Sequence, residues 1–256
     1  MAGNKKPKVI LLVAGEGKRL RPYTLDRPKC MVEIGGISLI DRQLSVLKSE
    51  GLSHIVMVGG YRSDMLKREG VKLKLNAQYQ TTNMVWTLFC AEEELEGDVI
   101  VSYGDIVYSR EVLKALLKSD ADISVVIDKQ WKGYWKNRSD NYLDDAETLK
   151  LRKDGSISEI GQKPIEEDKI EGQYIGLIKL SSKGLSQIKS VFNSALKNNE
   201  LLGKSIKGSY MTDLLQEVIN SNINVMSVPI YGGWIEVDTV EDMQSEVTKN
   251  RLKNIM

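Results

Sequence analysis

The stretch KVILLVAGEGKRLRPYTLDRPK, residues 8–29, joins an apolar run to a glycine-rich loop. The apolar run is typical of a buried strand, and Gly15 and Gly17 follow directly after it. Glycines let the backbone approach an anion closely, and exposed N–H groups in such a loop form an anion-binding concavity. Three side chains add positive charge: Lys18, Arg19 and Lys29. The stretch therefore predicts a strand followed by a loop that binds a triphosphate.

This loop differs from the two commonest phosphate-binding loops. A dinucleotide fingerprint would need a third glycine where the chain has Leu20. A P-loop would need GxxxxGK[ST], and although residues 203–205 supply its ending, Asn198 stands in place of its first glycine. An NAD-dependent Rossmann enzyme and a P-loop enzyme are therefore both disfavoured.

Composition and charge exclude several classes of protein. The chain has 256 residues, 41% of them hydrophobic, with 36 Lys+Arg against 35 Asp+Glu, which is the composition of a folded globular protein. A net charge of +1 gives no general attraction to nucleic acid or anionic membranes, so neither is an expected partner. The longest apolar run, Val9 to Ala14, is far shorter than the roughly 20 residues of a membrane span, and no secretion signal opens the chain. We expect a cytoplasmic protein.

Cysteine and histidine are too scarce for several kinds of site. Cys30 and Cys90 form no CxxC pair, so neither a disulfide framework nor a thiolate zinc site is expected. The one histidine, His54, leaves no histidine pair for a metal, and we expect it to be structural or exposed.

Strand-like and helix-like segments alternate through the first half of the chain. Strands are expected at residues 8–13, 55–58 and 99–102, with helices at 39–50 and 110–118 between or after them. This order favours βαβ units and a mainly parallel sheet. Further along, strands are expected at 123–127, 157–160 and 172–180, and helices around Leu185, Leu214 and the capping box of Thr239 with Asp242.

Residues 129–145 contain the polar and aromatic sequence WKGYWKNRSDNYLDD, which has no clean period. We expect an excursion above the sheet that extends over 129–170 and carries acceptor specificity. Because no linker or repeat interrupts the chain, residues 1–256 are expected to form one domain.

Residues 13–40, VAGEGKRLRPYTLDRPKCMVEIGGISLI, closely resemble the signature of the nucleotidyltransferase (nucleotide-sugar pyrophosphorylase) superfamily. That signature reads AGxGxRLxPxT, then PK, then GxxxLI, and its arginine and lysine fall on Arg19 and Lys29. Residues 58–61, 76–83 and 234–238 look most like the phosphocholine and phosphonate cytidylyltransferase branch. The resemblance implies an α/β fold: a single Rossmann-like domain with a mainly parallel mixed sheet, flanked by helices. The nucleotide would lie over the carboxyl ends of the strands.

Acidic residues suggest a metal site at the same edge of the sheet. Asp105 follows the apolar run 99–101, so it is expected at the carboxyl end of a strand, and Mg²⁺ prefers one or two carboxylates together with phosphate oxygens. In the family the matching aspartate holds the metal, and a second acidic ligand comes from near the C-terminus. Strand alternation would place Glu236 and Asp238 on one face, and either or both could be that ligand.

The resemblance also implies nucleotide and acceptor contacts. Lys163, in a region similar to the family's ExKP with two additional residues, is expected to contact the acceptor phosphate. Tyr174 and Gly176 resemble the strand that lines the acceptor pocket. The residues carried over as nucleotide-binding are Ala14, Gly15, Glu16, Gly17, Lys18, Gly60, Thr82, Asn83, Tyr103 and Gly104.

The acceptor itself is less determined. Trp131, Tyr134 and Trp135 would either cage a cationic ammonium group or pack the loop. Arg138 with the acidic pair 144–145 would either bind a zwitterionic acceptor or belong to a solvated loop.

The resemblance implies Mg²⁺-dependent transfer of CMP from CTP to a small phosphorylated or phosphonate acceptor, with release of pyrophosphate. The acceptor class is phosphocholine, an aminoalkylphosphonate or a phospho-amino acid, and the product would serve cell-surface or capsule synthesis. Arg19 and Lys29 would bind the triphosphate, and because the nucleophile is already an anion no general base is needed. A sugar-1-phosphate nucleotidyltransferase and a non-catalytic regulatory subunit of the same fold remain alternatives. A homodimer is compatible with the sequence.

Overall fold

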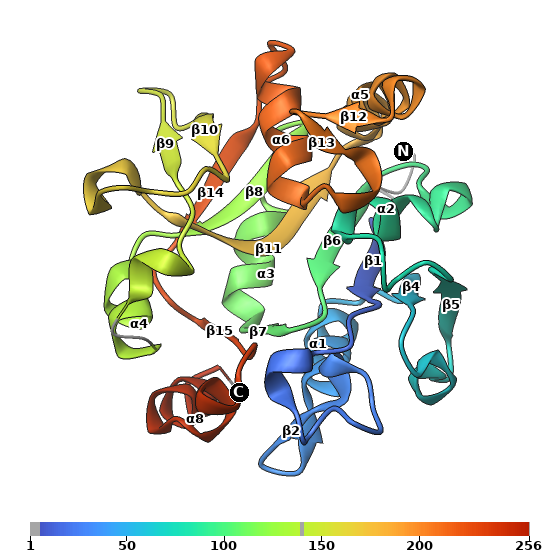
Figure 1. Ribbon diagram of the computed structural model, residues 1–256, viewed down its shortest axis with the longest axis vertical. Coiled ribbons are helices and arrows are strands. Elements are labelled where there is room, and N and C mark those ends of the chain that lie inside the picture. The colour runs from blue at the N-terminus through green and yellow to red at the C-terminus, as the bar shows by residue number, and fades with distance from the viewer. Residues whose placement is uncertain (1–5, 139–140, 256) are drawn as a thin grey trace.

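A seven-stranded mixed sheet forms the centre of the computed structural model, which describes residues 6–138 and 141–255 (Figure 1). The strands lie in the order β14 (Met226–Ile230), β8 (Ile123–Asp128), β11 (Gln173–Leu180), β6 (Val99–Tyr103), β1 (Lys8–Val13), β4 (Ile55–Gly59) and β5 (Val71–Leu75). Strand β11 runs antiparallel to both of its neighbours, and the other adjacent pairs are parallel. The expected mainly parallel mixed sheet is confirmed.

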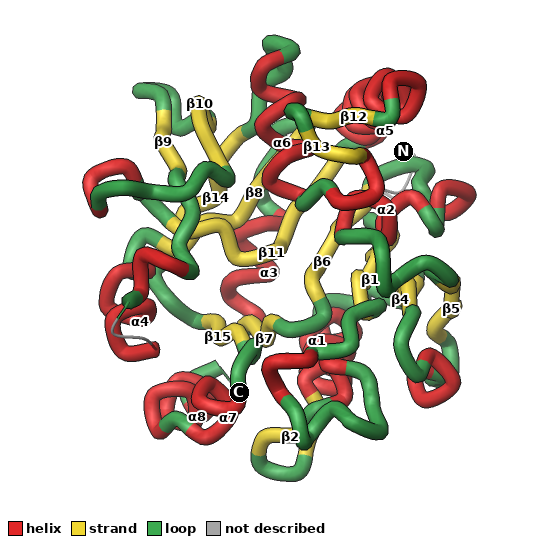
Figure 2. The backbone as a smooth tube through the Cα atoms, viewed as in Figure 1, coloured by secondary structure: helices red, strands yellow, loops and turns green. Residues whose placement is uncertain are grey.

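Helices and short strand pairs surround this sheet (Figure 2). The helices are α1 (Leu39–Ser49), α2 (Met84–Phe89), α3 (Arg110–Leu117), α4 (Trp131–Arg138), α5 (Ser182–Asn198), α6 (Met211–Asn220), α7 (Val240–Gln244) and α8 (Glu246–Lys253). The short pairs are β2 (Glu33–Ile34) with β3 (Ile37–Ser38), β7 (Ile106–Tyr108) with β15 (Trp234–Glu236), β9 (Leu149–Leu151) with β10 (Ile157–Ile160), and β12 (Glu200–Leu201) with β13 (Lys204–Ser205). No helix within residues 6–138 or 141–255 has the length and apolar character to span a bilayer.

Side-chain alternation along β1 divides the core between the two faces of the sheet. Ile10 and Leu12 belong to the apolar cluster that includes residues of α5 and α6. Val9 and Leu11 belong to the opposite cluster, which includes residues of α1 and α3. All four side chains are buried, which explains why this strand is continuously apolar in the sequence.

The capping box expected near the C-terminus is confirmed. The Thr239 hydroxyl accepts a hydrogen bond from the Asp242 N–H at 3.1 Å, and the Asp242 carboxylate accepts one from the Thr239 N–H at 3.0 Å. This box fixes where α7 begins, two residues after β15 and Val237.

The expectation that residues 129–145 have no regular structure is wrong over its first part, where α4 forms. The cause is tertiary. Trp131, Tyr134 and Trp135 have the i, i+3, i+4 spacing of one helical face, and all three are buried in the same cluster as Trp234. The strongly polar residues between them hide this face from a search for hydrophobic periodicity.

The end of β8 anchors the chain segment that leads to the site. The Asp128 side chain is fully buried, and its oxygens accept hydrogen bonds from the Trp234 indole N–H at 2.8 Å, the Gly232 N–H at 3.0 Å and the Gln130 N–H at 2.8 Å. One carboxylate therefore fixes the approach of β15 to the sheet.

We expect Asp128→Ala to lower the free energy of unfolding by about 3 kcal/mol, because buried donors lose a charged acceptor. Urea unfolding followed by tryptophan fluorescence measures the change, with Asp120→Ala as the control because Asp120 is exposed. Equal midpoints for the two variants would contradict the anchoring role of Asp128.

Candidate active site

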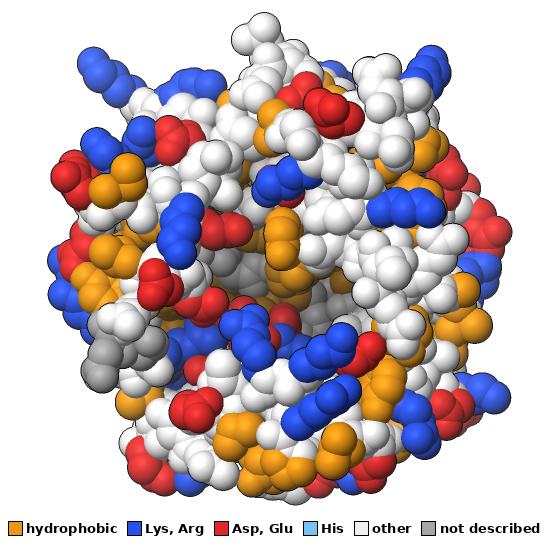
Figure 3. Space-filling view, viewed as in Figure 1, with side chains coloured by type: hydrophobic (Ala, Val, Ile, Leu, Met, Phe, Trp, Pro, Cys, Tyr) orange, Lys and Arg blue, Asp and Glu red, His pale blue; other side chains and the backbone are white. Residues whose placement is uncertain are grey.

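A cavity of about 380 Å³ opens where β1 and β6 end. Figure 3 shows it as a hollow at the centre of this face, with Lys and Arg side chains along one rim. The structure brings together most of the predicted nucleotide and metal residues in its lining: Ala14, Gly15, Glu16, Gly17, Lys18, Arg19, Lys29, Thr82, Asn83, Tyr103, Gly104, Asp105 and Asp238. The lining thus joins segments that are more than 200 residues apart in the chain.

The glycine loop packs directly against Lys29. Gly17 has a φ of +64°, and a Cβ there would lie 3.0 Å from the Cβ of Lys29, so a side chain at this position would be both strained and crowded. The Lys29 N–H donates to the Gly15 carbonyl at 3.3 Å, and the Thr24 hydroxyl donates to the Gly17 carbonyl at 2.7 Å. The loop and Lys29 therefore form one local unit.

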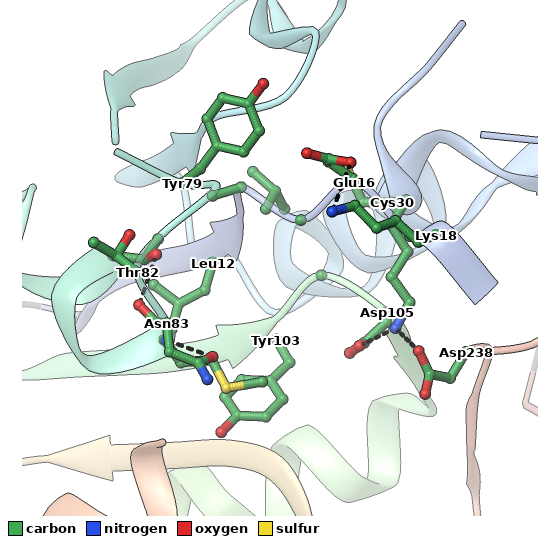
Figure 4. Close-up of a pocket in the computed structure, with 18 of the residues that line it drawn as sticks. Leu12, Glu16, Lys18, Cys30, Tyr79, Thr82, Asn83, Tyr103, Asp105 and Asp238 are labelled. Atoms are coloured by element: carbon green, nitrogen blue, oxygen red, sulfur yellow. Dashed lines mark hydrogen bonds and ion pairs between the residues drawn. The ribbon is translucent and has the colours of Figure 1, made fainter. Parts of the chain in front are cut away.

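The Lys29 ammonium lies between two carboxylates (Figure 4). Its Nζ is 2.6 Å from Asp105 Oδ2 and 2.5 Å from Asp238 Oδ1, and the three side chains are between 12% and 15% exposed. Burial alone would lower the pKa of Lys29, but the two carboxylates outweigh it and hold this pKa above its ordinary value. Lys29 is therefore a fixed cation at the floor of the cavity.

Arg19 provides a second cation at the same place. Its guanidinium pairs with the other oxygen of Asp238 and lies 3.8 Å from Asp145 Oδ1. Arg19 is more exposed than Lys29, so it lies at the rim while Lys29 lies beneath it.

Backbone hydrogen bonds bring the two carboxylates together. Asp105 lies in the turn between β6 and β7, and β7 pairs with β15, which precedes Asp238. The ladder continues beyond β15 because the Val237 N–H donates to the Asp105 carbonyl at 3.0 Å. The short β7–β15 pair therefore determines the spacing of Asp105 and Asp238.

The sequence analysis missed Gln43, which supports the Asp105 turn. Its Nε2 donates to the Tyr103 carbonyl at 2.9 Å and to the Ile106 carbonyl at 2.7 Å, on either side of Asp105. The side chain is fully buried. The one available signal was a polar residue on the otherwise apolar inner face of α1.

The carboxylates have the chemistry of a divalent-cation site. Asp105 Oδ1 is buried and has no hydrogen-bond partner, so it retains a free lone pair beside the Asp238 carboxylate. Within the described residues there is no group of three or more His, Cys, Asp or Glu side chains arranged to hold a metal ion. Two carboxylates fit Mg²⁺, which takes its remaining ligands from phosphates and water.

Glu236 and Arg138 differ from their expected roles. Arg138 is 8% exposed, with Nη1 2.7 Å from Glu236 Oε2 and Nε 2.8 Å from Asp242 Oδ1. Arg138 is thus committed to carboxylates of the protein and not to an acceptor. Strand β15 ends at Glu236, so strand alternation does not reach Asp238, and the two carboxylates turn to different cations. The structure favours Asp238 as the partner of Asp105.

The predicted aromatic cage is wrong, and the packing alternative is right. Trp131, Tyr134 and Trp135 are all buried, and the ring of Tyr134 lies 5.6 Å from that of Trp234. The Tyr134 hydroxyl also accepts from the Glu236 N–H at 3.0 Å, which corrects its expected contact with the acceptor. Cations do cover these rings, but they are the protein's own arginines, including Arg138 at 5.4 Å from the Tyr134 centroid.

The remaining acceptor residues lie outside the cavity lining. Lys163 is 71% exposed and 3.5 Å from Asp144. Gly176 has a φ of +81°, and a Cβ there would lie 2.6 Å from the Tyr103 ring, so this glycine makes room for the ring. Tyr174 packs edge-on against Tyr103 with centroids 5.7 Å apart. Tyr174 and Gly176 therefore support Tyr103, and their acceptor roles stay predictions.

The side of the cavity opposite Asp238 is neutral and polar, with Thr82, Asn83 and Tyr103 (Figure 4). Buried Asn76 donates to the Thr82 hydroxyl at 2.9 Å, and Asn83 caps α2 by accepting from the Met84 N–H. Gly60 borders Ala14, whose carbonyl accepts from the Tyr61 N–H at 3.1 Å. Lining residues that sequence reasoning missed are Leu12, Val13, Cys30, Tyr79, Gln80, Met84 and Thr87.

Relatives with curated names resemble the chain over its length. It is 39% identical over 251 residues to the CTP:phosphoglutamine cytidylyltransferase of Campylobacter jejuni, covering 94% of this chain and 99% of that protein. It is 33% identical over 116 residues to the choline-phosphate cytidylyltransferase of Streptococcus pneumoniae, covering 44% of this chain and 51% of that protein.

Solved structures share the fold. The CTP:phosphocholine cytidylyltransferase from Streptococcus pneumoniae matches with a TM-score of 0.72 and 22% identity, covering 96% of this chain and 99% of that one. The inositol-1-phosphate CTP transferase from T. maritima matches with a TM-score of 0.75 and 20% identity, covering 96% and 95%. The model of the MobA-like NTP transferase domain matches residues 9–163. With this match and a relative alike over nearly its whole length, the chain belongs to the MobA-like NTP transferase family and is a nucleotidyltransferase.

Proposed function

We propose that the chain transfers CMP from CTP to the phosphate or phosphonate group of a small acceptor and releases pyrophosphate. The observation that carries the proposal is the placement of Lys29 and Arg19 around Asp238, beside Asp105 and below the glycine loop. The preference for CTP rests on the named relatives, which use CTP with phosphoglutamine and with choline phosphate. As an activated CMP ester, the product would suit cell-surface or capsule assembly.

The cavity separates two tasks. Its glycine loop and cations, with Lys18 and Arg19 at the rim and Lys29 at the floor, suit a triphosphate. Its neutral polar side, with Thr82 and Asn83, suits a nucleobase and ribose, which carry hydrogen-bonding groups but no charge. This division orients the nucleotide with its phosphates toward Asp105.

The reaction joins two anions. An oxygen of the acceptor phosphate attacks the α-phosphorus of CTP, the bond from that phosphorus to the bridging oxygen breaks, and pyrophosphate leaves with the bonding electrons. Because the nucleophile is already ionised, the residues have no proton to remove from it. The work is positioning and charge stabilisation, which Lys29 and Arg19 supply as preorganised cations.

Asp105 and Asp238 would hold Mg²⁺, with phosphate oxygens and water completing its shell. When bound, the ion would neutralise charge on the α-phosphate and pyrophosphate. The pairing of Lys29 with both carboxylates keeps these side chains in place until the phosphates arrive.

Lys29→Met should lower kcat/KM for CMP transfer by about 10²- to 10³-fold, as expected for the loss of one preorganised charge. Pyrophosphate release measures the rate, and circular dichroism checks that the variant is folded. Lys183→Met is the control, because Lys183 is exposed and pairs with Asp122 before β8 begins. Near-normal activity of Lys29→Met would contradict the proposed site.

Treatment with EDTA should abolish transfer, and added Mg²⁺ should restore it. Asp105→Asn should raise the Mg²⁺ concentration needed for half-maximal rate at least about tenfold, because one of two charged ligands is lost. A Mg²⁺ titration of both proteins measures this shift. Full activity after exhaustive metal removal would contradict a metal role for the two carboxylates.

Pyrophosphate release across CTP, UTP, dTTP, ATP and GTP tests the proposed function itself, with phosphocholine, 2-aminoethylphosphonate, phospho-amino acids and glucose-1-phosphate as acceptors. We expect release with CTP and a non-sugar acceptor. Release only with glucose-1-phosphate would establish a sugar-1-phosphate nucleotidyltransferase instead, and release with none of them would favour a non-catalytic protein of this fold.

A further inference from the structure

We propose that Glu147 binds a primary ammonium group of the acceptor, so that the chain selects acceptors carrying both an anionic phosphorus group and a cation. This inference rests on the proposed function and specifies the acceptor class. Glu147 belongs to no residue set considered so far, and it comes from the stretch between α4 and β9.

Three elements place Glu147 beside the cavity. It directly precedes the β9–β10 hairpin, and its Oε1 accepts a hydrogen bond from the Thr212 hydroxyl of α6 at 3.3 Å. Its charge raises the pKa of both Tyr103 and Tyr174, which pack edge-on against each other. Because Tyr103 lines the cavity, Glu147 lies behind this wall, on the hairpin side.

The Glu147 carboxylate has no cationic partner among the residues that the structure describes. Lys204, the cation that acts on it, is committed to Asp213 at 2.7 Å. Burial raises the pKa of Glu147 to about 7, and the negative charges of Asp213 and Asp145 raise it further. A partly buried carboxylate without a counter-ion is costly, and a substrate cation would remove that cost.

The cleft is therefore electrically polarised. Lys29 and Arg19 supply positive charge where the phosphates are expected, whereas Glu147, with Asp145 and Asp213 nearby, supplies negative charge on the hairpin side. A zwitterionic acceptor matches this arrangement, with its phosphorus group toward Lys29 and its cation toward Glu147. An uncharged sugar ring would leave Glu147 without a partner.

The kind of cation follows from the neighbouring side chains. A primary ammonium donates hydrogen bonds to a carboxylate, whereas a quaternary ammonium has no N–H and is recognised by aromatic faces. Trp131, Tyr134 and Trp135 are buried away from the cavity lining and face the protein's own arginines. Recognition through Glu147 thus favours an amine over a trimethylammonium group.

Matched acceptor pairs test the inference with the full chain, CTP and Mg²⁺. The pairs are phosphoethanolamine against ethyl phosphate and 2-aminoethylphosphonate against ethylphosphonate, which differ only in the amine. We expect the wild type to prefer the amine in each pair by at least tenfold in kcat/KM. In Glu147→Gln this preference should fall at least tenfold, while the KM for CTP stays within twofold.

Two further variants separate charge recognition from folding. Glu147→Asp should retain part of the preference, because the charge remains. Glu166→Gln, in the exposed loop between β10 and β11, should retain all of it. Urea midpoints report whether each variant is folded.

The outcomes distinguish this inference from the proposed function. CMP transfer to both members of a pair at equal rates would overturn the role of Glu147 and leave cytidylyltransfer intact, as would an undiminished preference in Glu147→Gln. Failure of the wild type to use CTP with any acceptor of either pair would overturn both. A preference for phosphocholine over phosphoethanolamine would overturn the assignment of a primary amine.

Discussion

The contact of one ammonium group with two carboxylates organises this site. Lys29 follows the glycine loop, Asp105 follows β6, and Asp238 follows β15, so the two ion pairs join three segments that are distant in sequence. All three side chains are largely buried, where charges are tolerated only in partnership. The sheet carries these segments to one edge, and Gln43 and the β7–β15 pair give Asp105 its exact place relative to Asp238.

A second ionic cluster supports the first. Arg138 pairs with Glu236 and Asp242, and Asp242 also accepts from the Asp238 N–H at 3.0 Å. The backbone of Asp238 is therefore tied to α4 through a buried arginine. The segment expected to recognise the acceptor in this way supports the phosphate-binding side, while Glu147, which follows it, remains available for the acceptor.

The parts of the site that depend on local sequence could be predicted. The glycine loop, Lys29 and Asp105 each follow a strand or a glycine pattern, and parallel strands bring their carboxyl ends to one edge. The roles of Gln43, Arg138 and Glu236 could not be predicted, since each depends on a partner from a distant segment. Helix α4 was missed for the same reason, because its aromatic face is defined by Trp234, about 100 residues later.

A crystal structure of the chain with Mg²⁺ and a CTP analogue that has a methylene bridge between its α- and β-phosphates tests the central claim most directly. The account predicts phosphate oxygens within hydrogen-bond distance of Lys29 and Arg19, an α-phosphate beside Asp105, and the base toward Thr82 and Asn83. A nucleotide bound away from the glycine loop, or with its phosphates remote from Lys29, would contradict it.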